Sequence, residues 1–453
     1  MNMKSYIYRN FLVLSALFLI ASCGNELELQ PQQSISEEVA LSTPENVQAV
    51  LNGAYDEVGV SDLFGGETLR NSELLAAETV GGEITWQGTF NAPDEMFEKN
   101  MLTVNGDVSE VWLEGYETIN IANNVLTGLD VFTSQSDADR VEGEAKFIRA
   151  LIYFELVKFF GLPYEAGGAN GQLAVPLILD PTRSVSESDD VSRNSVADVY
   201  ARVIADLNDA VTLLPASNGF YATSGAAQAL RARVHLQMGN YAEALADANA
   251  VIGSGNYSLA ASFADAFNND SNGPEDIFAA QVSAQDGVNS MNTYFATPQF
   301  GGRDGDIGIN DSHVALYPAG DDRGAFFYND PGRFTLKFTN QFGNVPIIRL
   351  AEMYLIRAEC NVRGGTSTGD SPLNDINTLR GRANAPLLVT APTLADVLYE
   401  RRLELAFEGH RLHDIKRTQG SVGSLAYNAP ELVFPIPQRE MDANPNMVQN
   451  DGY

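Results

Sequence analysis

His410, His413 and Asp414 are the residues whose spacing comes closest to that of a metal site. This spacing can place two imidazole rings near one metal ion. A zinc site also needs a third and a fourth ligand, and no other part of the sequence nominates them. We therefore expect no metal ion and no other cofactor.

The sequence motifs of common enzyme classes are missing from this chain. It contains four histidines and no Gly-x-Ser-x-Gly, His-Glu-x-x-His, phosphate-binding loop or dinucleotide fingerprint. The 59 acidic residues supply many carboxylate pairs, but glycoside hydrolysis needs two of them about 5 or about 6.5–9.5 Å apart across a cleft. A hydrolase remains the minor alternative, and we expect a protein that is not an enzyme.

Trp86 is the first candidate for non-covalent chemistry, namely the binding of a sugar ring. It lies in the Gly-rich, non-helical stretch 81–88, where a large indole has no periodic core face to join. A flat apolar ring suits the C–H face of a sugar, and nearby carboxylates, amides and guanidinium groups suit its hydroxyls. Arg70, Asn71 and Glu78 could supply such groups. The alternatives are that Trp86 fills a local core and that Glu78 caps a helix.

A second candidate group lies about 200 residues further along, in another stretch without helical periodicity. Its members mix aromatic and charged character among glycines: Tyr294, Phe295, Phe300, Arg303 and Asp304. Such residues suit the far wall of the groove that Trp86 would line. The alternative is a solvated loop with a few packing aromatics.

The N-terminus indicates that the protein is exported. Lys4 and Arg9 precede an apolar run from Phe11 to Ile20, which is too short to span a bilayer and which ends in small residues before Cys23. This pattern is typical of a lipoprotein signal peptide, with lipid attached at Cys23. The alternative is an ordinary cleaved signal in which Cys23 is incidental.

Composition excludes two classes of protein. With 44% hydrophobic and 19% charged residues among 453, the chain is typical of a globular protein and not of a disordered one. The formal net charge of −31 disfavours binding to nucleic acid or to anionic lipid. If Cys23 carries lipid, Cys360 has no disulfide partner, and its apolar helical surroundings indicate a buried, inert thiol.

Helices must position these candidates, since apolar residues recur at helical spacing over most of the chain. Thr43 and Pro44 begin one helix, and Ser195 with Asp198 forms a capping box before another. We predict helices over about 44–55, 108–129, 142–160, 196–214, 226–238, 241–252, 346–363, 372–382 and 393–407. Gly239, Tyr241, Ala244 and Ala248 resemble a tetratricopeptide unit, in which small residues let two helices pack tightly.

The predicted organisation has three parts. Residues 1–22 form the signal peptide, 23–43 a lipidated tether, and 44–453 a single domain. Within it, 44–55, 107–262 and 345–453 form the helical scaffold, while the irregular stretches 56–106 and 263–344 form the binding loops. The alternating charges of 400–411 are interpreted as structural ion pairs and not as an active site.

Four motifs in this order resemble the SusD/RagB family of Bacteroidetes surface lipoproteins. They are Gly143-Glu144-Ala145-Lys146-Phe147-Ile148-Arg149-Ala150, Arg349-Leu350-Ala351-Glu352-Met353-Tyr354-Leu355-Ile356-Arg357-Ala358-Glu359, Glu400-Arg401-Arg402-Leu403-Glu404-Leu405-Ala406-Phe407-Glu408-Gly409-His410-Arg411, and Phe434-Pro435-Ile436-Pro437 followed by Asn444-Pro445-Asn446. The resemblance extends from the cysteine to the last residue.

The resemblance implies a mainly α, tetratricopeptide-like scaffold with a loop-rich binding face. It also implies a lipid-anchored protein on the surface of the outer membrane, which captures oligosaccharide or polysaccharide and passes it unchanged to a SusC-like TonB-dependent transporter. Some relatives capture peptides with the same scaffold, so a RagB-like peptide-binding role is the alternative. A purely structural adaptor, without a ligand-sized cleft, is a third.

Overall fold

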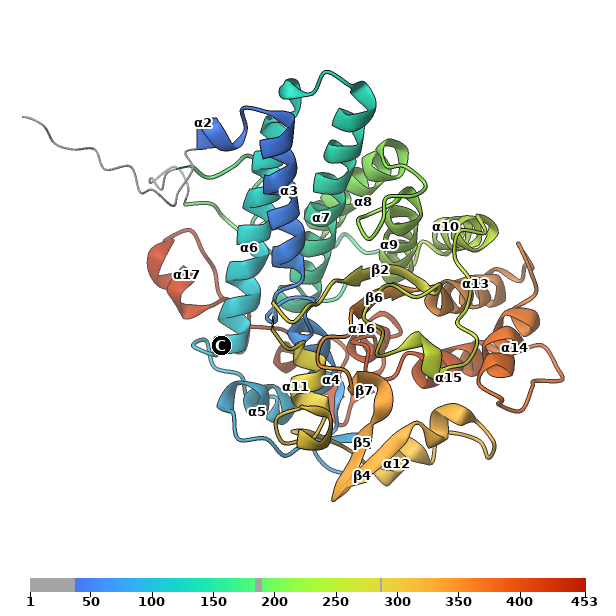
Figure 1. Ribbon diagram of the computed structural model, residues 1–453. Coiled ribbons are helices and arrows are strands. Elements are labelled where there is room, and N and C mark those ends of the chain that lie inside the picture. Colours follow the sequence, from blue (N-terminus) through green and yellow to red (C-terminus); the bar gives the residue numbers. More distant parts are fainter. Residues whose placement is uncertain (1–36, 184–189, 286) are drawn as a thin grey trace, which may run out of the picture.

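The computed structural model of the protein describes residues 37–183, 190–285 and 287–453 (Figure 1). The expected signal peptide, Cys23 and the first part of the expected tether lie outside these residues. The described part is built mainly from helices, with four small sheets.

The scaffold begins with three long helices, α3 (Pro44–Val58), α6 (Gly106–Thr127) and α7 (Gln135–Phe160), preceded by the short α2 (Glu37–Ala40). The Oγ1 atom of Thr43 accepts a hydrogen bond from the backbone N–H of Asn46 at 3.2 Å, which caps α3 as predicted. Helix α6 packs against both α3 and α7 (Figure 1). Residues 147–157 of α7 are all buried, as expected for a helix covered on several sides.

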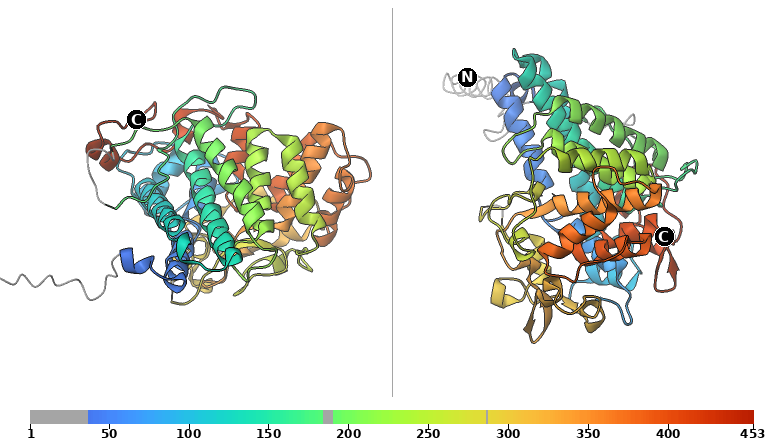
Figure 2. Two further views of the ribbon diagram at one scale, coloured as in Figure 1. Left: turned by 90° about the horizontal axis from the view of Figure 1, so that it is seen from above. Right: turned by 90° about the vertical axis from the view of Figure 1, so that its right-hand side faces the viewer.

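A row of helices continues from α7 through α8 (Val196–Leu213), α9 (Ser224–Met238), α10 (Tyr241–Gly253) and α13 (Leu350–Gly364). Each packs against the next, and the view from above in Figure 2 shows them standing side by side. The capping box of Ser195 and Asp198 is present at the start of α8. Gly239 ends α9 at a positive φ of 76°, and Ala244 and Ala248 are fully buried where α10 meets its neighbours. The predicted helical-hairpin fold is confirmed.

The C-terminal helices are α14 (Pro372–Arg382), α15 (Leu394–Glu404), α16 (Arg411–Arg417) and α17 (Gln438–Ala443). Helix α14 agrees with its predicted bounds, and helix α15 ends three residues earlier than predicted. Helices α13, α14 and α15 pack against one another around a small apolar cluster that includes Leu355, Ile376 and Val397. Cys360 is a buried free thiol whose pKa burial raises to about 12, in agreement with the inert role expected of it.

Several predicted boundaries are wrong, among them the start of the helix predicted over 142–160, which begins at Gln135. The stretch 56–106 contains α4 (Glu67–Ala76) and α5 (Asn91–Glu98), because α4 buries polar residues such as Arg70 and Glu73 and so shows no apolar periodicity. The helix predicted from Pro346 begins at Leu350, because residues 345–349 form strand β6 (Val345–Arg349), opposite β2 (Asp276–Ala280). Three of its five residues are β-branched, which favours a strand.

The four sheets of the described residues are antiparallel pairs. Besides β2 with β6, β1 (Ile84–Trp86) pairs with β3 (Ile307–Ile309), β4 (Phe327–Asp330) with β5 (Gly332–Thr335), and β7 (Ser421–Val422) with β8 (Leu425–Ala426). The short helices α11 (Ser290–Phe295) and α12 (Asp311–Val314) lie near β1, β3, β4 and β5 at the lower end of the molecule in Figure 1. The two irregular stretches of the sequence thus come together at this end.

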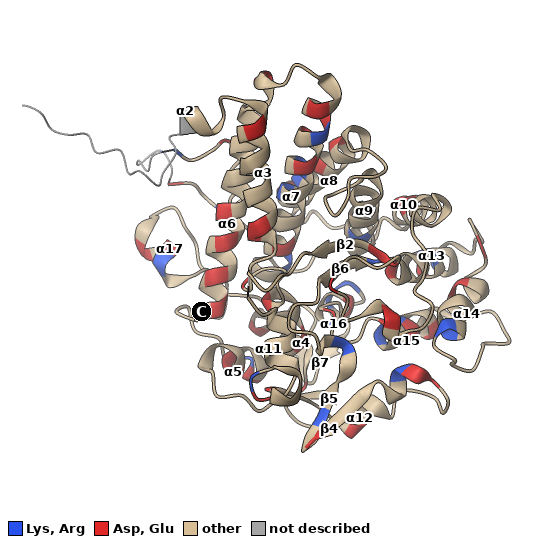
Figure 3. Cartoon of the chain, viewed as in Figure 1, with Lys and Arg blue, Asp and Glu red and all other residues tan. Residues whose placement is uncertain are grey.

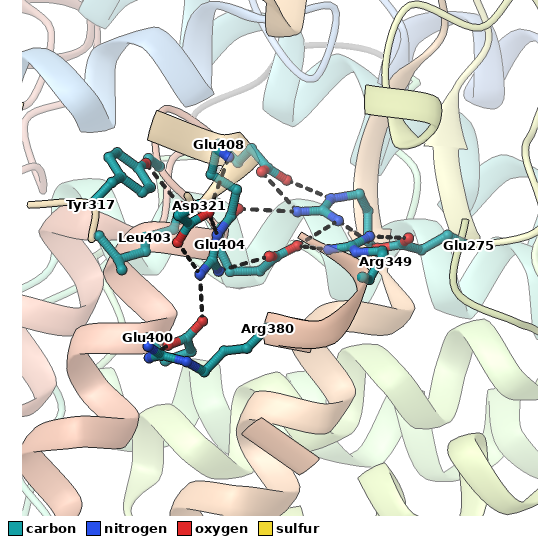
Figure 4. Close-up of polar contacts among 12 residues, drawn as sticks. Glu275, Tyr317, Asp321, Arg349, Arg380, Glu400, Leu403, Glu404 and Glu408 are labelled. Atoms are coloured by element: carbon teal, nitrogen blue, oxygen red, sulfur yellow. Dashed lines mark hydrogen bonds and ion pairs between the residues drawn. The ribbon is translucent and has the colours of Figure 1, made fainter. Parts of the chain in front are cut away.

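Buried ion pairs hold the C-terminal helices to the rest of the fold (Figure 4). Glu404 is fully buried and forms ion pairs with Arg323 at 3.2 Å, with Arg349 at 3.4 Å and with Arg382. Glu408 pairs with Arg349 at 2.8 Å and with Lys337 at 2.6 Å, and these neighbours lower the pKa of Glu408 to about 2 against the effect of its burial. The interpretation of residues 400–411 as a structural ion-pair segment is confirmed.

None of the helices in the described ranges combines the length and the apolar composition needed to cross a bilayer.

Candidate functional site

The two irregular stretches meet where strand β1 pairs with strand β3. Ile84 lies opposite Ile309 and Trp86 opposite Ile307, and the backbone N–H of Gln87 donates to the carbonyl of Asp306 at 2.8 Å. The side-chain amide of Gln87 also donates to the carbonyl of Gly305 at 2.7 Å. This pairing places the segment after Trp86 beside the segment that carries Arg303.

Tyr294 lies at the centre of a cluster of aromatic and guanidinium groups, which we name the aromatic cluster: Arg70, Trp86, Phe90, Tyr294 and Arg303. Arg70 lies over the Tyr294 ring at 4.1 Å, and Arg303 lies 5.1 Å from the same centroid. The rings of Trp86 and Tyr294 are 6.3 Å apart. Helix α4, strand β1, helix α11 and the loops after β1 and α11 each contribute to it. Four of the nine predicted binding residues therefore come together.

The positions of Trp86, Arg70 and Asn71 differ from what the sequence predicted, because all three are buried. Trp86 is 8% exposed, while Arg70 and Asn71 are fully buried. Tyr294 lies against the indole, and the backbone of Gly88 lies close to it, since a Cβ atom at Gly88 would come within 2.5 Å of Trp86 Cζ2. The indole is therefore a wall of the aromatic cluster and offers no open face.

Phe90 supplies the exposed ring, and the sequence analysis did not select it. It is 51% exposed, and the guanidinium of Arg303 lies over its ring at 3.8 Å. The Nε atom of Arg303 donates to Asp306 at 3.0 Å, which holds the guanidinium in place. Phe90 lies at the end of the same glycine-containing, non-helical stretch as Trp86. The feature of the sequence that pointed to Trp86 therefore applies to Phe90 as well.

The surface around Phe90 combines the groups that bind sugars. Gln87, three residues before Phe90, and Asp304, directly after Arg303, are both exposed, and the Arg303 side chain keeps 27% of its surface accessible. The Phe90 ring provides one apolar face. The guanidinium, the amide and the carboxylate provide hydrogen-bond donors and acceptors for the hydroxyls of a sugar. The arrangement can bind a polyhydroxylated ring without altering it.

Acidic groups beneath the surface balance the charge of Arg70. It forms ion pairs with Glu67 at 3.1 Å and with Asp107, and the Tyr294 hydroxyl donates to Glu67 at 3.2 Å. Burial raises the pKa of Glu67 to about 7 despite Arg70, and burial also raises the pKa of Tyr294 to about 12. The base of the aromatic cluster is thus a packed polar network that positions Tyr294.

Buried donors in this region lack partners among the described residues. They are Nη1 of Arg70, Nδ2 of Asn71 and Nε1 of Trp86. Buried polar groups are nearly always hydrogen-bonded in folded proteins, so each of these N–H groups is available to donate a hydrogen bond to a further oxygen atom.

Four further predicted residues lie apart from these contacts. Phe295 is buried in the core, 5.3 Å from the ring of Phe338, and Phe300 packs edge-on against Tyr328 at 4.8 Å. Glu78 is exposed and lines a cavity of about 270 Å³ whose walls include none of the residues of the aromatic cluster. Asp304 is exposed beside Arg303 and is not itself part of the stack.

The histidines are placed for structure. The Nδ1 atom of His410 accepts a hydrogen bond from the guanidinium of Arg401 at 3.2 Å, and burial lowers the pKa of His410 to about 3. His413 is buried with its Nε2 atom unpartnered among the described residues. Within residues 37–183, 190–285 and 287–453, no group of three or more His, Cys, Asp and Glu side chains is arranged to hold a metal ion.

Comparisons with known proteins agree on one family. Residues 27–236 match the family described as "Starch-binding associating with outer membrane", and residues 335–429 match the family described as "SusD family". A SusD-like protein of Formosa agariphila is 26% identical, with both chains covered in full. The starch-binding protein SusD of Bacteroides thetaiotaomicron is 33% identical over 28% of this chain and 24% of its own.

Solved structures show the same fold. A putative sugar-binding protein from Bacteroides vulgatus superposes with a TM-score of 0.81 at 26% identity, covering 91% of this chain and 99% of its own. A laminarin-binding SusD-like protein superposes with a TM-score of 0.73 at 24% identity, covering 91% of this chain and 100% of its own.

Proposed function

This chain belongs to the SusD/RagB family, and we propose that it is a cell-surface lipoprotein that captures oligosaccharide or polysaccharide and alters no covalent bond in it. The observation that carries this proposal is the exposed Phe90 ring under the Arg303 guanidinium, beside the buried Trp86 and Tyr294. Relatives described as starch-binding, sugar-binding and laminarin-binding support the class of ligand.

The aromatic cluster suits sugar binding better than peptide binding. Sugars present an apolar C–H face and a rim of hydroxyls, which match one ring and a few polar groups. Peptides are bound mostly through backbone hydrogen bonds along a strand or through a row of side-chain pockets. Peptide capture remains the second candidate because the family resemblance implies it, and cargo recovered with the protein from its native membrane distinguishes the two.

A role without chemistry agrees with the contacts of the four histidines. The side chains that contact them are Asn240 for His235, Glu83 and Tyr317 for His313, Arg401 and Glu352 for His410, and Phe159 for His413. Among the described residues, no histidine is hydrogen-bonded to a serine or a cysteine, which is one common way of activating a nucleophile. The proposal predicts that incubation with the captured glycan releases no reducing sugar.

We further propose that residues 1–22 are removed as a signal peptide and that Cys23 carries the lipid, so that 23–43 tether the domain 44–453 to the outer membrane. Several acyl chains, each contributing about 0.8 kcal/mol per buried CH₂, retain a protein on a membrane. Cys23→Ala should shift the protein from the membrane fraction to the soluble fraction. Equal membrane retention of parent and variant would contradict the anchor.

The partner in this proposal is a SusC-like TonB-dependent transporter, which the protein covers and supplies with glycan. Affinity need not be high, because a micromolar to millimolar site, about −8 to −4 kcal/mol, suffices when several copies engage one polymer. Co-purification of the transporter from solubilised outer membranes tests this partnership.

Affinity electrophoresis tests the ligand class. The parent should be retarded in gels containing at least one neutral polysaccharide from a panel that includes starch and laminarin, and Phe90→Ala should abolish most of that retardation. Leu387→Ala, which truncates another exposed apolar side chain in the loop between α14 and α15, is the matched control. Equal retardation of parent and Phe90→Ala would contradict the assigned site.

A further inference from the structure

A second hollow in the structure is larger than the one beside Glu78. Its volume is about 880 Å³, and its walls come from the end of α3, from α6, from β2 and from the loops around residues 220 and 287. Figure 1 shows the lower end of α3 between α6 and β2. Small-molecule sites typically occupy about 300–1,000 Å³, so the cavity is large enough for two or more sugar rings.

Three aromatic rings form one wall of this cavity. Tyr55 and Tyr221 lie 4.8 Å apart, and Phe220 lies 4.3 Å from Tyr221. The hydroxyl of Tyr221 donates to Asn52 at 3.2 Å, and the hydroxyl of Tyr55 accepts from the backbone N–H of Ala222 at 3.0 Å. Two of the rings are therefore fixed by hydrogen bonds.

Phe220 is the exposed member of this wall. It is 50% exposed at the cavity, close to the value for Phe90 in the aromatic cluster. A phenyl ring left half in water beside a large polar hollow provides an apolar platform next to hydrogen-bonding groups, which is the combination that sugar rings require.

Part of the wall is acidic. Asp56, Glu57, Asp62 and Glu114 line the cavity, and none of the described residues in its lining is a lysine, arginine or histidine. Figure 3 shows acidic positions along α3 and α6. Burial, followed by repulsion from neighbouring carboxylates such as Glu57, raises the pKa of Glu114 to about 7. Carboxylates accept hydrogen bonds from sugar hydroxyls or from ammonium groups, and they repel other carboxylates and sulfates.

The cavity adjoins the aromatic cluster through the backbone. Gly65, which lines the cavity, accepts a hydrogen bond at 2.8 Å from the N–H of Ser290 at the start of α11, the helix that carries Tyr294. Asp62 lines the same cavity shortly before α4, the helix that carries Arg70. One glycan chain that contacted both places would bind with a raised effective concentration at the second.

From the cavity, the half-exposed ring and the absence of basic groups among the described residues of its lining, we propose that it is a second saccharide subsite, selective for sugar residues that carry no acidic group. The inference rests on the proposed glycan-capture function and adds the substrate class: neutral or amine-bearing saccharides bind here, and uronic or sulfated ones do not. The aromatic cluster and this cavity then act as two separate contacts for one polymer.

Calorimetric titration with three sets of oligosaccharides of equal length tests the proposal: neutral glucan fragments, chitosan fragments with free amino groups, and alginate fragments with uronic acids. Each is titrated into the parent, Phe220→Ala, Phe90→Ala and the control Leu387→Ala. We expect Phe220→Ala to weaken binding of neutral or amine-bearing fragments about tenfold and to leave any alginate binding unchanged. Thermal unfolding of each variant establishes that it remains folded.

The outcomes separate the two proposals. If the parent binds the fragments and only Phe90→Ala weakens this binding, the proposal of glycan capture stands and the proposal of a second subsite is overturned. If Phe220→Ala weakens alginate as much as the other fragments, the stated selectivity is overturned. If the parent binds none of the three sets, both proposals are overturned.

The acidic wall provides an independent readout. At a pH of about 8.5, where the Glu114 carboxyl with its pKa of about 7 is ionised, replacing Glu57 and Glu114 by glutamine together should increase the affinity for alginate fragments relative to the parent, because the repelling charges are removed. Glu243→Gln, on the exposed face of α10, changes one charge away from the cavity and should not alter it. If the double variant binds alginate fragments no more tightly than the parent does, the proposed role of the carboxylates is contradicted.

Discussion

The guanidinium of Arg303 lies 3.8 Å above the ring of Phe90, and these two residues come from stretches more than 200 positions apart in the sequence. Strand pairing between β1 and β3 brings them together, and Asp306 holds the guanidinium in place. The stack therefore depends on the planarity of arginine as well as on its charge.

Arg303→Lys tests this stack. Lysine keeps the positive charge and can still pair with Asp306, but it does not present a flat group to the ring. We expect glycan affinity to fall about three- to tenfold, which corresponds to about 0.7–1.4 kcal/mol. Arg333→Lys is the matched control, because Arg333 lies on strand β5 and pairs with Asp311 of α12. Equal losses in the two variants would show that the stack has no special part in binding.

Trp86→Ala should lower stability more than any exposed variant of the aromatic cluster. The indole is 8% exposed, and truncating a buried tryptophan typically costs about 3–5 kcal/mol. Phe90→Ala, at a half-exposed position, should change the free energy of unfolding far less. Denaturant titration of both variants measures the difference. If Trp86→Ala unfolded at the same denaturant concentration as the parent, the burial of the indole would be contradicted.

Glu404→Gln should destabilise the fold by about 3–5 kcal/mol, because it removes the carboxylate that three buried arginines share. These arginines hold the pKa of Glu404 well below its usual range, so it is ionised at neutral pH. The exposed Glu243→Gln should change stability by less than about 0.5 kcal/mol. Comparable stabilities for the two variants would mean that the network contributes little.

Glu73 gives a pH-dependent test. Burial raises the pKa of this carboxyl to about 8 in the folded protein, from about 4.5 in the unfolded chain, so the folded state binds a proton that the unfolded state releases. The contribution of the protonated Glu73 carboxyl to the free energy of unfolding is present at low pH and is lost as pH rises to about 8. Because glutamine carries no such proton, the stability of Glu73→Gln relative to the parent should rise between pH 5 and pH 8. Parallel stability curves would contradict the raised pKa.

The sequence allowed the scaffold to be predicted because its helices carry regular apolar faces and clear caps, as at Thr43 and Ser195. It did not reveal α4, whose buried face carries Arg70, Asn71 and Glu73 in place of apolar residues. It also did not reveal β6, since a run of Val, Pro and Ile before a helix has no periodicity that separates it from the helix. Local patterns fail where tertiary contacts decide the element.

The site was predicted in part. Aromatic and charged residues in glycine-containing stretches pointed to Trp86, Tyr294 and Arg303, and the structure brings these together. Which ring faces water could not be predicted, because this depends on the three-residue pairing of β1 with β3 and on the position of Gly88 against the indole. Phe90 is exposed, while Trp86 is covered, for that reason.

The central claim is that the protein binds a saccharide through the Phe90 surface and returns it unchanged. The most direct measurement is a calorimetric titration with the glycan that retards the parent in electrophoresis, followed by mass analysis of the recovered glycan. We predict a micromolar to millimolar affinity that Phe90→Ala weakens at least tenfold, and a recovered glycan of unaltered mass. Binding that is insensitive to Phe90→Ala, or a glycan recovered in shorter fragments, would contradict the claim.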